Sequence, residues 1–330
     1  MTPTRRQICI AASCFATLLG DARSARLRRV GALSLSEADA EAERIGGRMF
    51  TEAMRGFGWD EGEIVFDRRY AAGDLRRLQA LAIDLAHSDA ELILASLTPA
   101  IEAAQRATRT IPIVMIAATF PVERGFVKSL ARPGGNLTGT AVQFNKLQVK
   151  SLQMMHELAP DRSRVAVLSG PISAHTLSLQ KGVREEFTQA AHGMGLRVEY
   201  FDIAKESDIP GALERILASR ADLMSVGTSG VLDLRTREII DFAIQHKILA
   251  SGAYTLFASL GGAMYYGSNL QDIIDRSASF VDRILRGAKP SDLPVELPTR
   301  YDLILNLKTL RAINITVPRK VLIRASEVVS

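Results

Sequence analysis

Cysteine is almost absent from this chain: Cys9 and Cys14 are its only two copies, and both lie close to the N-terminus. The chain beyond them needs no disulfide and offers neither a thiol nucleophile nor a cysteine-ligated zinc site. Aromatic residues contribute only 6% of the sequence, and tryptophan occurs once. Aliphatic residues are abundant by comparison, and this composition is common in α/β proteins.

The chain beyond the N-terminal segment also has little net charge. The formal net charge is +5, but the first 26 residues hold four arginines against one aspartate, so the remaining chain carries +2. No basic stripe with interleaved aromatic residues follows. We therefore expect no nucleic-acid partner.

Long apolar runs are missing after the N-terminal segment, which reads as an export signal over residues 1–26. Arg5 and Arg6 precede an apolar run, Ile8–Gly20, that is too short to cross a bilayer comfortably. A cleaved leader of this kind predicts a soluble periplasmic protein. An uncleaved apolar helix is the alternative, and the export route stays open. A lipoprotein site at Cys14 is disfavoured because the apolar run continues past it.

Catalytic and cofactor motifs are not found. The sequence has no G-x-S-x-G elbow, no P-loop, no G-x-G-x-x-G after a strand and no H-E-x-x-H. Its histidines lack metal-ligand spacing, although His175 lies near an expected binding loop. We expect no enzyme activity, no cofactor and no metal site.

Strand and helix patterns alternate along the whole chain. Strands are expected at 28–34, 64–70, 90–96, 111–117, 137–142, 164–170, 196–203, 221–226, 248–253, 262–267 and 301–307. The helices expected between them include 38–57, one capped by Asp74, one opened by Thr98 and Pro99, 121–131, 146–158, 207–220, 232–246 and 271–286. Two such series joined near Val142 predict two doubly wound, Rossmann-like α/β lobes.

Ligand contacts are expected where strands lead into helices, because free backbone N–H groups point into the crevice at the carboxyl ends of the strands. Small hydroxyls are common in these loops and suit a ligand carboxylate. The hydroxyl candidates are Ser34, Ser36, Ser96, Thr98, Thr119, Ser169, Ser173, Thr228 and Ser229. The aromatic candidates for clamping an apolar body are Phe120, Phe144, Tyr254 and Tyr266. Helix capping is the alternative role for each hydroxyl, and hinge or core packing for Phe144 and Tyr266.

Several motifs carry a family resemblance. A Pro-Ile-Val strand at 112–114, the Arg-Pro-Gly-Gly-Asn-Leu-Thr-Gly turn at 132–139 and Asn-Leu-Lys-Thr at 306–309 occur in this order. Together they resemble the aromatic-amino-acid-type substrate-binding proteins of bacterial ABC importers. The resemblance implies a type I periplasmic binding fold that closes on its ligand by a multi-strand hinge. It also implies a monomer that delivers a small-molecule ligand to an ABC permease, which an ATPase subunit powers.

The resemblance further implies two more crossings between lobes, near Gly267 and near Pro298. Lobe 1 would then comprise 27–142 plus 268–297, and lobe 2 would comprise 143–267 plus 298–330. The sequence departs from the family where acidic or asparagine residues are common, at Phe120, 169–171 and 228–229. With no carboxylate to hold an ammonium, these departures predict a carboxylate-bearing or apolar solute without a free amine.

Other functions stay open. A ligand sensor that feeds a signalling receptor has the same sequence features as a transport protein. The effector domain of a transcriptional regulator would need a helix-turn-helix ahead of the first strand, and residues 1–27 are too short and too apolar for one. An α/β enzyme would need a positioned base or nucleophile in the binding loops.

Overall fold

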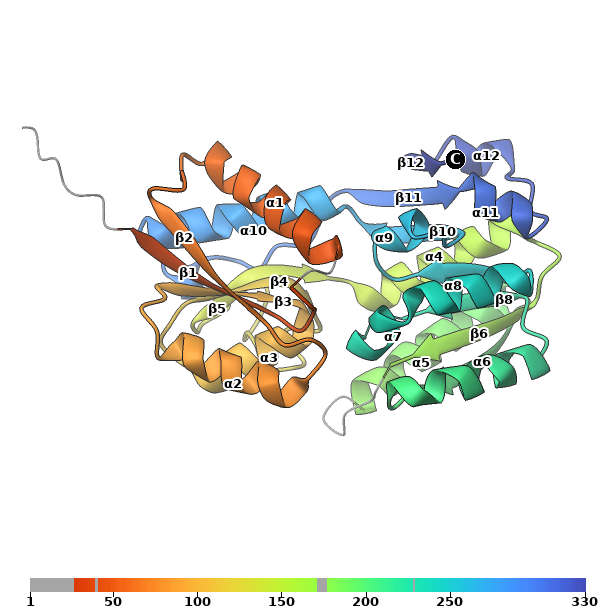
Figure 1. Ribbon diagram of the computed structural model, residues 1–330, viewed down its shortest axis with the longest axis horizontal. Coiled ribbons are helices and arrows are strands. Elements are labelled where there is room, and N and C mark those ends of the chain that lie inside the picture. Colours follow the sequence, from red (N-terminus) through yellow and green to blue (C-terminus); the bar gives the residue numbers. More distant parts are fainter. Residues whose placement is uncertain (1–26, 39–40, 171–176, 228) are drawn as a thin grey trace, which may run out of the picture.

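Two β-sheets with helices on both faces make up the computed structural model, which describes residues 27–38, 41–170, 177–227 and 229–330 (Figure 1). We call the five-stranded sheet with its helices the first lobe, and the seven-stranded sheet with its helices the second lobe. The predicted fold class, two doubly wound α/β lobes, is confirmed.

The first sheet is wholly parallel and has the order β2-β1-β3-β4-β5. Its strands are β1 (Arg28–Ser34), β2 (Ile64–Tyr70), β3 (Leu92–Ser96), β4 (Ile113–Thr119) and β5 (Leu137–Val142). Three of the predicted strands, at 28–34, 64–70 and 137–142, match these bounds residue for residue.

Side chains of the first sheet alternate between two helical layers. In β3, Leu92 and Leu94 pack with α1 (Glu41–Gly56) and α10 (Leu270–Leu285). Ile93 and Ala95 point the other way, toward α2 (Leu75–Ala86) and α3 (Leu97–Ala107). Figure 1 shows these helix pairs on opposite faces of the sheet. A strand buried on both faces is an apolar run without alternation, which is the pattern that predicts β3.

The second sheet has the order β12-β11-β10-β9-β8-β6-β7. The strands from β10 to β7 are parallel, whereas β11 runs antiparallel to β10, and β12 runs parallel to β11. Its strands are β6 (Arg164–Ser169), β7 (Arg197–Asp202), β8 (Leu223–Val226), β9 (Leu249–Gly252), β10 (Met264–Ser268), β11 (Tyr301–Asn306) and β12 (Glu327–Val329). The strand β12, which pairs with β11, is not predicted by the sequence pattern.

Helices again cover both faces of this sheet. One face packs against α4 (Phe144–Leu158), α5 (Leu177–Gly193), α11 (Leu307–Ala312) and α12 (Arg319–Leu322). The other packs against α6 (Ile209–Ala218), α7 (Gly230–Leu234), α8 (Thr236–Gln245) and α9 (Leu256–Ser259). Short 3-10 helices, η2 (Glu206–Asp208) and η3 (Pro290–Asp292), complete the elements.

The chain passes between the two sheets at the carboxyl ends of their strands. Strand β5 of the first sheet leads through Gln143 into α4, which packs on the second sheet. Strand β10 of the second sheet leads through Asn269 into α10, which packs on the first. Because β5 and β10 run parallel to the preceding strands of their sheets, β4 and β9, the carboxyl ends of these strands face the region where the lobes are joined. The lobe boundaries at 142, 267 and 297 stay a prediction.

The helix predicted over 121–131 is wrong. These residues form turns: Gly125 adopts φ +69°, and the Pro121 carbonyl accepts hydrogen bonds from the N–H groups of both Phe126 and Val127, at 2.9 and 3.2 Å. Phe126 and Val127 are buried in the core beside α3. Tertiary burial of these two side chains therefore outweighs the local helical pattern.

Other differences are smaller. Asp74 caps α2 as predicted, because its carboxylate accepts from the N–H groups of Arg76 and Arg77. Thr98 lies inside α3 and does not cap it. The helix predicted over 232–246 is two helices, α7 and α8, with Arg235 between them. In the described residues no helix is long and apolar enough to cross a membrane.

Candidate ligand-binding site

Each lobe has one topological switch point, where consecutive helices leave for opposite faces of the sheet. In the first sheet the switch lies between β1 and β3, and in the second it lies between β6 and β8. The parallel parts share one pattern, β2-β1-β3-β4-β5 and β7-β6-β8-β9-β10. Open α/β sheets bind ligands in the crevice at such points, outside the carboxyl ends of the strands.

A serine and a carboxylate meet at the end of β1. The Ser34 hydroxyl donates a hydrogen bond to the Glu43 carboxylate and accepts one of 3.2 Å from the Ser36 N–H. Desolvation and the nearby charge of Glu43 raise the pKa of Tyr70. The sequence pattern indicates a solvated helix start for Glu43. In the structure its carboxylate instead occupies the end of β1, beside a predicted site residue.

Two predicted hydroxyls are joined at the ends of β3 and β4. The Oγ1 atoms of Thr98 and Thr119 are 2.8 Å apart, and the Thr119 N–H donates to Thr98 Oγ1 at 3.2 Å. Ser96, the last residue of β3, makes no side-chain capping bond to α3. The Thr98–Thr119 pair therefore braces two neighbouring strand ends of the first lobe.

A β-bulge in β4 sets the path of the residues that follow it. The pairing of β4 with β5 shifts register between Met115 and Ala118. Gly139 permits this, because a Cβ there would lie 2.3 Å from the Met115 carbonyl oxygen, and its φ is +132°. The Thr140 hydroxyl accepts from the Ala117 N–H at 3.0 Å and occupies the bulge. Phe120, just beyond, has a left-handed backbone with φ +53° and is partly exposed.

The switch point of the second lobe brings together the ends of β6 and β8. A Cβ on Gly170 would lie 2.2 Å from Ser229 Oγ, so these two residues pack closely. Ser169 ends β6. Ser229 Oγ accepts from the Leu232 N–H at 3.2 Å and thus caps α7, the alternative role considered for it. Two further candidates, Ser173 and Thr228, lie outside the described residues.

An unpredicted carboxylate, Asp233, lies in the helix that Ser229 caps. Burial raises the pKa of Asp233 to about 7, offset in part by the N–H of Ser229. The residue is nevertheless exposed. The surrounding protein thus disfavours the charged form, although the residue keeps contact with solvent. Asp233 belongs to the helix rather than to the loop before it, so the inference that the binding loops lack acidic groups stays a prediction.

Tyr254 lies close to Asp233, whose charge contributes to a rise in the pKa of the phenol. The main cause is burial, and the pKa reaches about 12. The hydroxyl donates to Thr236 Oγ1 at 2.7 Å, and the ring packs edge-on against Phe257 with centroids 6.3 Å apart. Tyr254 is therefore held by Thr236 and Phe257 and packs against the core of the second lobe, and its role in clamping a ligand stays a prediction.

The other two aromatic candidates lie elsewhere. Phe144 is the first residue of α4, directly after the crossing from β5, and is partly buried. Tyr266 packs against the core under α4, and burial there raises the pKa of its phenol. That position agrees with the packing role considered for Tyr266.

The two lobes approach each other beside the second switch point. A Cβ on Gly73, in the turn between β2 and α2, would lie 3.8 Å from Cδ1 of Leu234 in α7. Leu234 is 47% exposed and directly follows Asp233. Asp233 therefore lies next to a contact between the first and second lobes.

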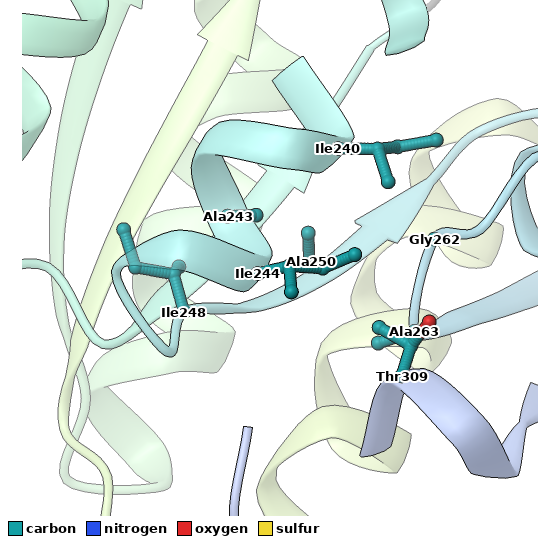
Figure 2. A pocket seen from close by; sticks show the side chains of 8 residues that line it. All are labelled: Ile240, Ala243, Ile244, Ile248, Ala250, Gly262, Ala263 and Thr309. Carbon is teal, nitrogen blue, oxygen red and sulfur yellow. The ribbon is translucent and has the colours of Figure 1, made fainter. Parts of the chain in front are cut away.

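A small apolar crevice lies inside the second lobe, between α8 and α11 (Figure 2). It is lined by Ile240, Ala243, Ile244, Ile248, Ala250, Gly262, Ala263 and Thr309. It is too narrow for a water molecule and belongs to the core rather than to a ligand site. Within the ranges that the structure describes, no group of three or more His, Cys, Asp or Glu side chains could hold a metal ion.

Known proteins resemble the chain over most of its length. A tyrosine-binding protein of Clostridioides difficile (strain R20291) is 26% identical over 267 residues, 80% of this chain and 75% of the relative. The structure matches a Streptococcus ABC domain in complex with L-Trp (TM-score 0.81, 22% identity, 92% of this chain and 100% of that one). It also matches a conserved domain protein of Vibrio cholerae (TM-score 0.81, 25% identity, 91% and 99%).

The match to a family model is broader still. It covers residues 29–329, which include every strand and helix described above except the first residue of β1. The chain belongs to the ABC transporter substrate binding protein family.

Proposed function

We propose that this chain is the extracytoplasmic solute-binding protein of an ABC importer. It captures a small organic solute between its two lobes and delivers it to a permease, with transport powered by a separate ATPase subunit. The leader at 1–26 directs it to the periplasm and is removed. The observation that carries this proposal is the pair of matching switch points at strand ends that face the lobe junction.

The solute class we propose is an aromatic α-amino acid. Asp233 supplies a solvent-accessible carboxylate, and a ligand ammonium close to it would favour the ionised form. Tyr254 beside it offers an aromatic face. The Thr98–Thr119 pair and the backbone N–H groups at the strand ends of the first lobe suit the ligand carboxylate. Relatives that bind tyrosine and L-Trp support this class.

Closure of the lobes on the solute is the mechanism we propose for delivery. A ligand favours the closed form only by contacting both lobes, because it shifts the equilibrium by the difference in its affinity for the two forms. Asp233 in the second lobe and the strand ends in the first would supply such contacts. The permease would then recognise the closed form.

Isothermal titration of the purified protein at pH 8, where Asp233 is largely ionised, tests the solute class. The panel contains L-tyrosine, L-tryptophan and L-phenylalanine, with 3-phenylpropanoate as an amine-free counterpart of phenylalanine. We expect at least one amino acid to bind, and 3-phenylpropanoate to bind at least about tenfold more weakly, since a charge-assisted hydrogen bond contributes about 1.5–3 kcal/mol. Equal or tighter binding of the amine-free acid would favour the amine-free solute predicted from the sequence. Binding of none would contradict the aromatic class.

A further inference from the structure

Leu97, the residue after β3, combines an unfavourable backbone conformation with an exposed apolar side chain. Its backbone is left-handed, with φ +64°, a conformation that glycine adopts freely and a branched, bulky residue adopts only under strain. Its side chain is 49% exposed and therefore gains little from the core. Position 97 therefore carries backbone strain together with an exposed apolar side chain.

The neighbouring strand end repeats this arrangement. Phe120, the residue after β4, also has a left-handed backbone, with φ +53°. The two residues flank a fixed point, because Leu97 precedes Thr98 and Phe120 follows Thr119, whose hydroxyls are 2.8 Å apart. Two strained apolar residues are thus held at adjacent strand ends by one hydrogen-bonded pair.

Capping of α3 does not explain why Leu97 has a left-handed backbone. The preceding residue, Ser96, makes no side-chain capping bond, so the turn does not serve to cap the helix. Glycine at 97 would give the same backbone path without the strain. Strain that a protein retains without local benefit is concentrated at ligand clamps and other functional sites. The place of Leu97, at a strand end bordering the β1/β3 switch point, is such a site.

We propose that Leu97 is a specificity-determining residue. Its side chain packs, together with Phe120, on the apolar body of the solute and limits the width of the body that the first lobe accepts. The inference rests on the proposed function, because it assumes that a solute binds at these strand ends. It adds a residue and a selection rule that neither the motifs nor the hydroxyl pattern of the sequence predicts.

Two substitutions separate the strain from the contact. Leu97→Ala keeps a side chain on a left-handed backbone but removes most of the apolar surface, whereas Leu97→Gly removes both surface and strain. Leu217→Ala, at a leucine of α6 in the second lobe with a similar exposure of 46%, is the control. Melting temperatures without ligand and titrations with L-phenylalanine, L-tryptophan and the bulkier 2-naphthylalanine are measured for each protein.

We expect Leu97→Gly to melt a few degrees above the unmodified protein, because glycine relieves the left-handed strain, and Leu97→Ala and Leu217→Ala to melt close to it. Both Leu97 variants should bind the amino acids that the unmodified protein accepts roughly tenfold more weakly. Binding of 2-naphthylalanine should improve relative to phenylalanine in Leu97→Gly, whereas Leu217→Ala should keep the original profile.

An unchanged ligand profile in both Leu97 variants, with normal binding by the unmodified protein, would overturn this inference and leave the proposed function standing. An equal loss of affinity for every ligand, narrow or bulky, would also overturn it, because size selection would be absent. If neither the unmodified protein nor Leu97→Gly binds any member of the panel, the proposed solute class fails together with the inference. Binding by Leu97→Gly alone would support size exclusion by Leu97.

Discussion

Asp272 in the first turn of α10 accepts a hydrogen bond of 2.7 Å from the backbone N–H of Thr299, on the segment that returns to β11. A second acceptor bond of 3.2 Å comes from Nε of Arg276, whose guanidinium also reaches Thr299 Oγ1 at 2.8 Å. The carboxylate therefore ties the start of α10 to the segment that leads into β11. Its side chain is only 9% exposed, so these bonds are poorly replaced by water.

Replacing Asp272 should loosen this connection. Desolvation opposes ionisation, but the hydrogen bonds from Thr299 and Arg276 outweigh it and lower the pKa of Asp272. We expect Asp272→Ala to cost about 2–3 kcal/mol of unfolding free energy, because the donors lose a nearly buried acceptor. Asp272→Asn should cost less, since its amide oxygen still accepts from Thr299. Urea unfolding at pH 7 measures both costs.

The stability that Asp272 contributes should decrease at low pH. A carboxylate whose pKa is lowered on folding contributes stability above its unfolded pKa, about 4, and loses it as the pH falls through the folded value. The difference between the unmodified protein and Asp272→Asn should therefore shrink below about pH 4. A difference that stays constant from pH 7 to pH 3 would show that the charge of Asp272 contributes nothing.

Asp233 should act in the opposite direction. Its pKa is raised to about 7 by burial, so folding favours the protonated form. Stability from this group is fully present below the unfolded pKa, about 4, and is lost as the pH rises toward 7. We expect Asp233→Asn to raise the melting temperature of the ligand-free protein more at pH 8 than at pH 5. The same variant should bind amino acids more weakly at pH 8. Equal melting shifts at both pH values would contradict the raised pKa.

Gly139 should tolerate no side chain. A Cβ there would meet the Met115 carbonyl oxygen at 2.3 Å, and φ +132° is unfavourable for any other residue. We expect Gly139→Ala to destabilise the protein by at least about 2 kcal/mol and to disturb the β4 bulge that leads to Thr119 and Phe120. Gly135→Ala is the matched control, because nothing lies within 4 Å of its Cβ position. Thermal unfolding that is equal for the two variants would argue against a specific role for Gly139.

Gly262 packs closely against an aromatic ring in the second lobe. A Cβ on it would lie 2.2 Å from the ring of Phe257, a fully buried side chain. Overpacking of this kind costs about 1–3 kcal/mol, so Gly262→Ala should lower the unfolding free energy by that amount. Gly211→Ala, within α6 and with open space around it, should instead raise it by about 0.5–1 kcal/mol. Denaturant titrations of both variants test whether the signs are opposite.

The strand positions follow from local chemistry. The runs that become β1, β2 and β5 are rich in apolar and β-branched residues and are bounded by polar or glycine-containing segments, so pattern and structure agree to the residue. Asp74 caps α2 as predicted because its carboxylate needs only the N–H groups two and three residues ahead. Features that depend only on a residue and its near neighbours in the chain could be predicted from the sequence.

The candidate site was predictable only in outline. The strand-to-helix loops were located correctly, and the Thr98–Thr119 bond joins two predicted residues. Glu43 and Asp233 were missed because each lies in a helix after its loop, where a charged residue ordinarily faces water. Glu43 contacts Ser34, and Asp233 lies near Tyr254. In each case the two residues come from segments that approach only in the folded chain. Ser173 and Thr228 stay predictions.

The sequence by itself determined the alternation of strands and helices, the two-lobed fold class and the family, because periodicity and turn motifs are local properties of the chain. Tertiary structure alone decided that 121–131 forms turns, since burial of Phe126 outweighs helical pattern. It also decided that the carboxyl of Asp233 is desolvated, which raises its pKa, and that Leu97 bears left-handed strain. Desolvation and strain depend on what surrounds a residue in space, and no spacing in the sequence encodes them.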